Sequence, residues 1–381
     1  MNILLTIHHN LDPHSGAPGS VLKLGQAYQQ LGHEVTYYAF DTLPRWVPNW
    51  ATGLVFPECL AGYLAQTLKQ RSLDVIDTST GDGWIWGAWL QRLNRKPPLL
   101  VTRSHGLEHA VHLQNLDDAR QGRLSLSWKY PLYHGGFRLW EVATSLRCAD
   151  LVLMLNQQDL KYATEHLAVD PARAYVCPNG IPDAFLNLPF EPMPADAATL
   201  GIAVIGTYIQ RKGIQYSVPA LNTILQRYPQ VFVSFLGTGC SVEQVHANFE
   251  PTVRDRVHVI PKFDHATLPS RLHNHQIKLF APLTEGFGKA LIEAMACGLA
   301  PLTTAAAGPL EVVRDGHDAI VVPLRSQTAI EQALERLITN RSELEQLRHR
   351  AYTTAQQYSW VNAAQQRLSL YQQALERKYL Q

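Results

Sequence analysis

The chain has 381 residues, of which 46% are hydrophobic, and its formal net charge at pH 7 is +1. This length exceeds what one hydrophobic core usually holds, so we expect two domains. The small net charge excludes a large uniformly basic surface and therefore disfavours nucleic acid as a partner.

In chain order, the first elements predict a parallel sheet. Residues 2–8 form an apolar strand, 9–19 a polar loop, 20–31 a helix that ends at Gly32, and 34–40 the next strand. A strand, a helix and a strand in this order form a βαβ unit. The pattern continues with strands near residues 74–78, 99–102, 151–155 and 174–177.

The glycines of the first loop leave two interpretations open. Gly16 and Gly19 are similar to a dinucleotide-binding loop, but the full G-x-G-x-x-G pattern is absent. The loop either binds a nucleotide or simply connects a strand to a helix.

Clustered prolines between residues 178 and 195 then interrupt the alternation and indicate an interdomain linker. A second series follows, with a strand at 199–205, a loop at 206–213, a helix at 214–228 and a strand at 231–236. We therefore predict an α/β protein with two doubly wound, Rossmann-like domains that face a ligand cleft. The predicted segments are a first domain at 1–182, a linker at 183–198, a second domain at 199–357 and a C-terminal helix at 358–381 that packs back toward the first domain.

One stretch of the second domain carries the clearest chemistry. An apolar strand at 277–281 leads into a loop with Gly286 and Gly288, and a helix follows and ends at Gly298. Glycines let a ligand approach the backbone, and the first amides of a helix are free to bind an anion. Glu285 and Glu293 lie before and inside this helix. A diphosphate between two carboxylates suggests a sugar nucleotide.

Glu285 and Glu293 form an E-x7-E pattern, and the surrounding Glu285-Gly-Phe-Gly and Glu293-Ala-Met-Ala-Cys-Gly298 resemble the retaining, nucleotide-sugar-dependent glycosyltransferases of the GT-B fold. Within that fold the chain is similar to the family 4-like enzymes, also called glycosyl transferases group 1. The resemblance extends over essentially the whole chain. The further landmarks that carry it are the Gly16 loop, Ser104-His105-Gly106, Pro178-Asn-Gly180, Lys212-Gly213, Gly237-Thr-Gly239, Glu311-Val-Val-Arg-Asp-Gly316 and Ser359-Trp360.

The resemblance also implies roles for single residues. Glu293 would hold the donor ribose, the amides of Phe287 and Gly288 its phosphate, and Glu285 the transferred sugar. The catalytic residues that it implies are His105, Glu285, Arg211 and Lys212. The donor-binding residues are Gly16, Gly206, Arg211, Lys212, Phe263, Glu285, Gly286, Phe287, Gly288, Lys289 and Glu293.

By the same resemblance, the reaction moves a hexose from a nucleotide-diphosphate sugar, with UDP or GDP as the expected nucleotide, to a hydroxyl of a glycan, a lipid-linked sugar or a small molecule. No metal and no further cofactor are expected. The first domain would bind the acceptor. Basic and aromatic residues alternate in it between Arg120 and His134, and this segment either contacts a lipid-linked or glycan acceptor at a membrane surface or forms a partly buried helix with its preceding loop.

Several positions depart from the family pattern. Thr207 stands where an arginine is usual, Lys289 where an aliphatic residue is common, Ala307 in place of the first of two glycines, and Ala319 in place of a turn glycine. Arg211 is a candidate for the missing cation.

Other site hypotheses are weaker. His105, His109 and His112 with Glu108 lack the H-E-x-x-H spacing of a zinc site. His8, His9 and His14 fit loop histidines near an anion, and Asp117 with Asp118 fits a polar surface turn. The rival functions are a sugar-nucleotide epimerase of similar fold and a catalytically silent subunit of a glycan-assembly complex.

Cysteine usage and the apolar runs predict the compartment. The five cysteines, Cys59, Cys148, Cys177, Cys240 and Cys297, are scattered and odd in number, which is typical of reduced thiols in the cytoplasm. The first residues form a strand in place of a secretory signal, and no apolar run approaches the roughly 18 residues of a membrane span. We expect a cytoplasmic protein. If it contacts a membrane, the contact would be peripheral and at the inner face.

Overall fold

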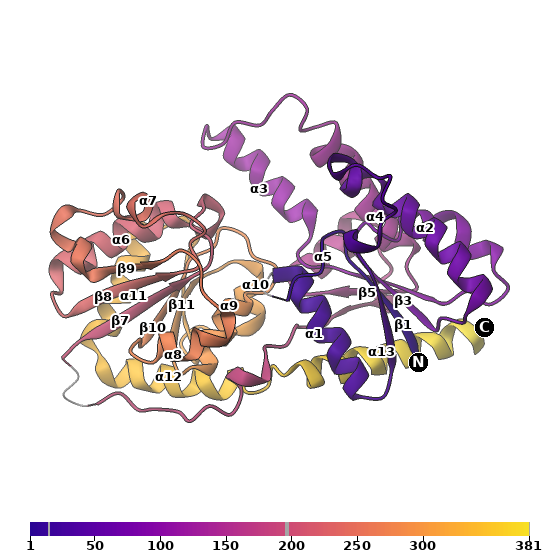
Figure 1. The fold of residues 1–381 in the computed structure, drawn as a ribbon. Helices are drawn as coiled ribbons and strands as arrows, with labels where there is room; N and C mark the ends of the chain where they lie inside the picture. The colour runs from indigo at the N-terminus through magenta and orange to yellow at the C-terminus, as the bar shows by residue number, and fades with distance from the viewer. Residues whose placement is uncertain (14–15, 195–197, 381) are drawn as a thin grey trace. The chain divides into compact units, whose positions relative to one another are not determined.

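The computed structural model describes residues 1–13, 16–194 and 198–380. The chain divides into two compact units, one formed by Met1–Gly180 with Trp360–Gln381 and the other by Ile181–Ser359. Each unit holds one six-stranded sheet with helices on its two faces (Figure 1). The prediction of two doubly wound α/β domains is confirmed. Residues 195–197 of the predicted linker lie outside the described residues.

The sheet of the first unit is parallel in the order β2-β1-β3-β4-β5-β6. Its strands are β1 (Asn2–Thr6), β2 (Glu34–Tyr38), β3 (Val75–Ser79), β4 (Leu99–Arg103), β5 (Leu151–Met154) and β6 (Ala174–Val176). The strand order reverses between β1 and β3, which makes the carboxyl ends of these two strands the place where a ligand of such a sheet binds.

Helices cover both faces of this sheet. They are α1 (Gly16–Gln30), α2 (Thr52–Gln70), α3 (Glu108–Arg120), α4 (Arg138–Cys148), α5 (Gln157–His166) and α13 (Trp360–Leu380). The single turns are η1 (Phe40–Thr42), η2 (Asn49–Ala51), η3 (Trp86–Leu90), η4 (Gln91–Leu93), η5 (Tyr133–Phe137) and η6 (Pro171–Arg173). Alternation along each strand separates two cores, because successive side chains point to opposite faces. Leu4 and Ile76 pack with α2 and α4, whereas Ile3 and Val75 pack with α1 and α13.

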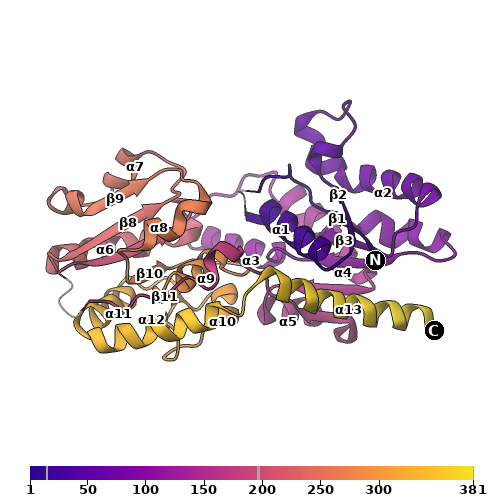
Figure 2. The same ribbon diagram turned by 60° about the horizontal axis from the view of Figure 1, so that its bottom comes forward.

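The C-terminal helix α13 belongs to the first unit, where it lies beside α1 (Figures 1 and 2). It brings two polar side chains into the core. The Tyr371 hydroxyl donates to Asp77 Oδ2 at 2.6 Å and lies 2.9 Å from the Tyr28 hydroxyl. Arg367 donates to Asn179 Oδ1 at 2.9 Å. The C-terminal helix α13 therefore completes the core of the first unit.

The sheet of the second unit is parallel in the order β12-β11-β10-β7-β8-β9. Its strands are β7 (Leu200–Ile205), β8 (Val231–Leu236), β9 (Val257–Ile260), β10 (Ile277–Phe280), β11 (Ala300–Thr304) and β12 (Ile320–Val322). In order of appearance this is 6-5-4-1-2-3, the strand order of dinucleotide-binding folds, with its reversal between β7 and β10.

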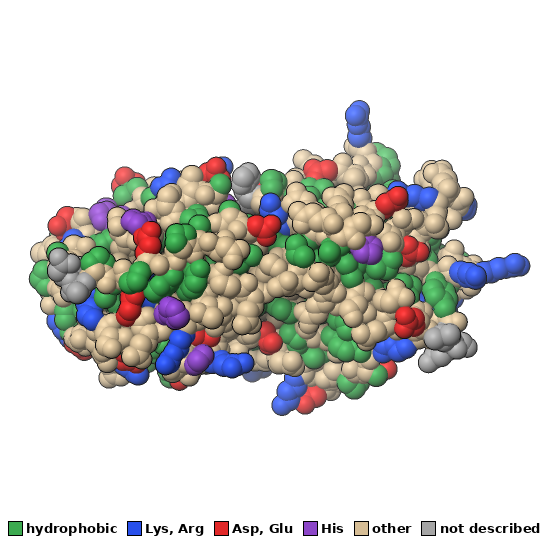
Figure 3. Space-filling view, turned by 90° about the horizontal axis from the view of Figure 1, so that it is seen from below, with side chains coloured by type: hydrophobic (Ala, Val, Ile, Leu, Met, Phe, Trp, Pro, Cys, Tyr) green, Lys and Arg blue, Asp and Glu red, His purple; other side chains and the backbone are tan. Residues whose placement is uncertain are grey.

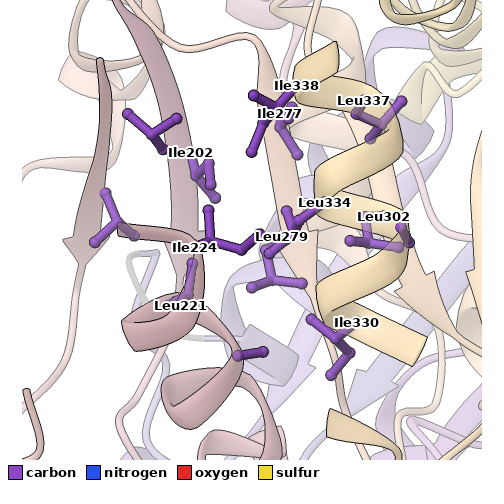
Figure 4. Close-up of a cluster of buried hydrophobic side chains, with 14 of the residues drawn as sticks. Ile202, Leu221, Ile224, Ile277, Leu279, Leu302, Ile330, Leu334, Leu337 and Ile338 are labelled. Atoms are coloured by element: carbon purple, nitrogen blue, oxygen red, sulfur yellow. The ribbon is translucent and has the colours of Figure 1, made fainter. Parts of the chain in front are cut away.

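The helices of the second unit enclose an aliphatic core. They are α6 (Ile214–Arg227), α7 (Val242–His246), α8 (Leu268–Leu272), α9 (Lys289–Ala296), α10 (Ala307–Val312), α11 (Gln327–Thr339) and α12 (Arg341–Ala355). Its single turns are η7 (Asp183–Phe185), η8 (Gln210–Lys212), η9 (Pro251–Arg256) and η10 (His265–Thr267). Figure 4 shows Leu279 of β10 between Ile224 of α6 and Leu334 of α11, and Ile277 of the same strand beside Ile338. On the face shown in Figure 3, acidic and basic side chains are interspersed, in line with the small net charge.

Two local predictions were wrong. Gly16 and Gly19 lie in the first turns of α1 and not in a loop. Gly19 serves close packing, because a Cβ atom there would lie 2.8 Å from the carbonyl oxygen of Pro13. The segment 120–134 is mostly exposed turn and not a partly buried helix, since α3 ends at Arg120 and the next regular element is η5.

Candidate active site

The reversal point of the second unit carries the predicted glycine loop. The loop 281–288 leaves the carboxyl end of β10 and opens α9, whose N-cap residue Gly288 has the left-handed φ of +88°. A left-handed residue without a side chain ends the loop and leaves no side-chain cap on the helix amides. Gly298, with φ of +79°, follows the helix as predicted.

A lysine from the neighbouring strand connection pairs with this loop. Lys212 Nζ lies 2.5 Å from Glu285 Oε2, and both side chains are partly exposed. Lys212 is held in place because Gly213, with φ of +73°, packs so tightly that a Cβ atom would lie 1.9 Å from the carbonyl oxygen of Ala281. The ammonium group keeps further N–H donors for a ligand, since an ammonium has three.

Gly206 lies at the end of β7, beside Lys212. Its φ is +122°, and the nearest atom to a Cβ built on it is Cε of Lys212, at 4.0 Å. A small cavity of about 20 Å³ is lined here by Gly206, Thr207, Lys212, Phe280 and others. The neighbouring Arg211 side chain is exposed, and its backbone oxygen accepts from Leu283 N at 3.0 Å, which ties η8 to the glycine loop.

The loop is also supported from behind by α10. Gly308 N donates to the Glu285 carbonyl oxygen at 2.9 Å, and a Cβ atom at Gly308 would lie 2.5 Å from Phe287 N. In the Ala307-Gly308-Pro309 turn, Ala307 replaces the first of the two glycines of the family pattern. The second glycine, Gly308, is present and therefore allows the close contact. Lys289, the first residue of α9, is half-buried.

Glu293 lies inside α9 and is only 2% exposed. Its Oε1 atom has no hydrogen bond among the described residues, although His265 Nε2 of η10 lies within ion-pair distance of it, at 3.1 Å. Phe263 lies just before η10, and its ring is 3.0 Å from a Cβ atom built at Gly237. A buried acid with an unused acceptor oxygen beside a loop of glycines is suited to bind hydroxyl groups.

A buried lysine lies beneath this site. Lys278 of β10 is fully buried, and its Nζ makes no hydrogen bond within the described part of the chain. It lies 5.4 Å from the ring centre of Phe280, and Lys212 Nζ lies 5.3 Å from the same ring. Burial, and next the charge of Lys212, lower the pKa of Lys278 well below its ordinary value, while Glu293 acts in the opposite direction. Burial therefore disfavours the charged form of Lys278.

His105 follows β4, and its side chain reaches the end of β3 at the reversal point of the first unit. Its Nε2 atom lies 3.2 Å from Ser79 Oγ at the end of β3. Burial, and next the positive Arg103, lower the pKa of His105 well below its ordinary value, so the imidazole is neutral at pH 7. Arg103 itself is buried, with its Nε 3.3 Å from Asp77 Oδ1, and it donates to the Thr6 carbonyl oxygen.

A second polar group lies at the same strand ends. His8, after β1, donates from Nδ1 to Asp82 Oδ1 at 2.7 Å, and Thr6 Oγ1 donates to Asp82 Oδ2 at 3.0 Å. Arg138 of α4 lies within 3.4 Å of both His8 Nε2 and Glu108 Oε1. These groups surround the carboxyl ends of β1 and β3 with hydrogen-bonding side chains, as expected of a site for a polyhydroxylated ligand.

Two family models match the chain. The model described as Glycosyl transferases group 1 matches residues 197–357, and Glycosyltransferase Family 4 matches residues 14–185. The chain belongs to the glycosyltransferases. Among relatives, the phosphatidylinositol N-acetylglucosaminyltransferase gpi3 subunit of Schizosaccharomyces pombe is 28% identical over 214 residues, which cover 53% of this chain and 44% of that protein. The alpha-maltose-1-phosphate synthase of Mycolicibacterium smegmatis is 25% identical over 307 residues, which cover 71% and 74%. The match to the first of these relatives thus spans less than half of its length.

Solved structures agree on the fold. The sucrose-phosphate synthase of Thermosynechococcus elongatus superposes with a TM-score of 0.76 at 21% identity, with 99% of each chain covered. Anabaena HepE, solved in complex with UDP, has a TM-score of 0.71 at 18% identity and covers 98% of this chain and 100% of its own. The glycosyltransferase therefore has the GT-B fold, as predicted.

The glycosyltransferase brings most of its predicted donor residues together in the second unit. Gly206, Arg211 and Lys212 follow β7, and Glu285 to Lys289 follow the neighbouring strand β10. Gly16 and His105 both lie in the first unit, and Gly16 is the first residue of α1. Sequence reasoning missed His265, Lys278, Asp82 and Arg138. Asp82 and His8 follow neighbouring strands of the first sheet, a signal that the strand pattern offered.

Most residues of the weaker site hypotheses make local contacts within the glycosyltransferase. His112 Nδ1 lies 3.1 Å from the Tyr130 hydroxyl, and His109 is buried. Asp117 and Asp118 both pair with Arg123. His14 lies outside the described residues. Residues 1–13, 16–194 and 198–380 contain no group of three metal-ligating side chains placed to share an ion, and no helix among them is long and apolar enough to cross a bilayer.

Proposed function

We propose that this glycosyltransferase moves a hexose from a nucleotide-diphosphate sugar to a hydroxyl of a glycan, a lipid-linked sugar or a small molecule, with retention of the anomeric configuration. The donor would carry UDP or GDP, and neither a metal nor a further cofactor takes part. The observation that carries the proposal is the Lys212–Glu285 pair beside the open glycine loop at the reversal point of the second sheet.

In this proposal the second unit binds the donor. The amides that follow Gly286 and the N-terminus of α9 meet the diphosphate, because helix amides and the helix dipole favour an anion. Glu293 accepts hydrogen bonds from the ribose through its unused Oε1. Phe263 lies where the base would be held, and Lys289 adds positive charge at the first turn of α9.

The chemical step then rests on charge. Negative charge grows on the diphosphate as the glycosidic bond breaks, and Lys212 with Arg211 stabilises it by charge-assisted hydrogen bonds. Glu285 accepts from sugar hydroxyls while it keeps Lys212 oriented. A donor phosphate oxygen takes the proton of the acceptor, so no carboxylate of the chain acts as the nucleophile.

The first unit is proposed to bind the acceptor. His105 is neutral, so it exchanges hydrogen bonds with hydroxyl groups without adding a charge next to the reacting sugar. Neighbouring structures support the donor class, since Anabaena HepE was solved with UDP and with UDP-glucose. The cytoplasmic location stays a prediction.

The test is turnover of UDP-glucose, UDP-N-acetylglucosamine, GDP-mannose and ADP-glucose by the purified chain in the presence of EDTA, with water or an octyl glycoside as acceptor. We expect release of UDP or GDP and, by NMR, an α-linked product. A β-linked product contradicts retention, and loss of activity in EDTA contradicts metal independence. An epimerised donor without any acceptor product identifies an epimerase. A folded chain without turnover on any donor supports the alternative of a silent subunit.

A further inference from the structure

The exposed apolar side chains of the molecule are concentrated in one part of the first unit. Of the 15 large hydrophobic residues that are exposed among those described, 11 lie between Trp46 and Trp140. Five of them are tryptophans. These are Trp46, Trp50, Trp89, Trp128 and Trp140, with exposed fractions of 76%, 84%, 65%, 78% and 46%. Together with Phe137 they are called the aromatic surface below.

The topology places five members of the aromatic surface near one edge of the sheet. Trp46 and Trp50 lie between β2 and α2, and Trp128, Phe137 and Trp140 lie between β4 and the first turn of α4. All strands of this sheet are parallel, so their carboxyl ends lie along the same edge. Trp89 lies further along the connection from β3 to β4, in η3. The segments that follow β2 and β4 include α2, α3 and α4, which Figure 1 shows grouped on one side of the first unit.

Direct contacts join part of this surface. The buried Trp84 ring lies 5.9 Å from the ring of Trp89 and 4.9 Å from that of Trp140, and Phe137 stacks on Trp140 at 5.7 Å. The turn η3, which carries Trp89, packs against both α2 and α4. The rings of Trp89, Phe137 and Trp140 are thus held by contacts within the fold, while each side chain stays partly exposed.

Cations lie in the same segments. Arg45 precedes Trp46 and is exposed. Lys129 is exposed as well, with its Nζ 5.4 Å from the ring centre of Trp128. Indole rings favour the headgroup layer of a bilayer, and nearby Lys and Arg side chains are attracted to anionic headgroups.

We propose that the aromatic surface of the first unit binds an anionic lipid bilayer, with its indole rings in the headgroup layer and the flanking Arg45 and Lys129 on lipid phosphates. A bilayer fits better than a protein partner because the tryptophans stand on separate turns beside exposed cations. Such a surface matches a soft, negatively charged layer without requiring one complementary shape.

The aromatic surface adjoins the polar groups at the strand ends of the first unit. Arg138, next to Phe137 in sequence, lies within 3.4 Å of His8 and Glu108 at the strand ends. An acceptor held in the bilayer would therefore reach this unit at the edge that carries those groups. This consequence rests on the proposed function, whereas bilayer binding itself does not.

The experiment is cosedimentation of the full chain with phosphatidylcholine vesicles and with vesicles that also contain phosphatidylglycerol. We expect binding to the mixed vesicles at least about 10-fold stronger than to phosphatidylcholine alone, weakened by salt and accompanied by a blue shift of tryptophan emission. Trp50→Ser with Trp128→Ser, the two most exposed indoles, should lower binding to the mixed vesicles by about 10-fold or more.

The matched control is Leu310→Ser with Leu324→Ser, which removes two exposed apolar side chains from the second unit. It should leave vesicle binding unchanged. Circular dichroism checks that each variant is folded, and turnover of a soluble donor separates this proposal from the transfer reaction, because the tryptophan variants should keep it. The proposal is overturned if the native chain stays in the supernatant with both vesicle types, or if the tryptophan variants bind as well as the native chain. It is also overturned if those variants only dissociate a dimer, as judged by size-exclusion chromatography.

Discussion

The two units share one plan and use it differently. In the second unit the loop 281–288 joins β10 directly to α9, and its chemistry comes from backbone amides and a few charged side chains. In the first unit, residues 104–150 separate β4 from β5 and carry exposed aromatic rings as well as polar groups. A site formed by backbone amides needs glycines at fixed spacing, so it can be predicted from a sequence. A site formed by side chains on long connecting segments has no such spacing and cannot be predicted in this way.

The largest expected effect concerns the charges of the second unit. Lys212→Met and Glu285→Gln should each lower kcat/KM for the donor by about 10² to 10³, because Lys212 stabilises the charge that grows on the diphosphate, and Glu285 binds the sugar and orients Lys212. Initial-rate measurements check this. Arg336→Met is the matched control, since it breaks an exposed ion pair with Glu343 in the same unit and should leave the rate unchanged. A Lys212→Met enzyme with nearly native kcat/KM would refute the assignment.

The next effect tests whether the loop geometry itself matters. Gly308→Ala places a Cβ atom 2.5 Å from Phe287 N and 2.6 Å from the Glu285 carbonyl oxygen, so the loop has to shift. A displacement of this size should lower turnover by up to about 10². Gly53→Ala, in α2 with open space around it, is the control and should have no effect on rate. Equal rates for both variants would show that the loop tolerates the shift.

A smaller effect is expected in the core of the first unit. Tyr371→Phe leaves Asp77 Oδ2 without the donor from α13, and this should lower the free energy of unfolding by about 1–3 kcal/mol. Urea denaturation measures it. Tyr379→Phe, whose hydroxyl bonds an exposed carbonyl oxygen, should change the free energy by less than about 0.5 kcal/mol. Similar losses in both variants would mean that α13 does not stabilise the unit through its buried polar groups.

The smallest effect concerns Lys278. Its pKa in the folded chain lies well below the ordinary 10.5, so between that lowered pKa and pH 10.5 the unfolded state binds more protons. The free energy of unfolding should therefore rise with pH up to about 10.5, by at most about 1.4 kcal/mol per pH unit. Lys278→Met should remove this rise and stabilise the chain at pH 7 by on the order of 1 kcal/mol. Lys161→Met, at an exposed position, is the control. An unchanged pH dependence in Lys278→Met would contradict a lowered pKa of Lys278.

The sequence predicted regular elements better than tertiary pairings. The strand at 231–236 and the end of α9 at Gly298 lie where expected, because apolar runs and a terminal glycine signal them locally. Gly16 and Gly19 misled the prediction, since a glycine needed for close packing cannot be told from one needed for a turn. Lys278 was overlooked inside an apolar strand. The pairing of His8 with Asp82 depends on two neighbouring strands, and the roles of His105 and Arg211 stay predictions.

The central claim is that the second unit binds a nucleoside diphosphate through the glycine loop and Glu293. Calorimetric titration of the purified chain with UDP, GDP and ADP in the presence of a chelator tests it most directly. We predict clear binding of UDP or GDP, weakened by about 10-fold or more in Glu293→Ala and unchanged in Glu331→Ala, a partly exposed control position on α11. A folded protein that binds none of the three nucleotides, or a Glu293→Ala variant that binds as tightly as the native chain, would contradict the claim.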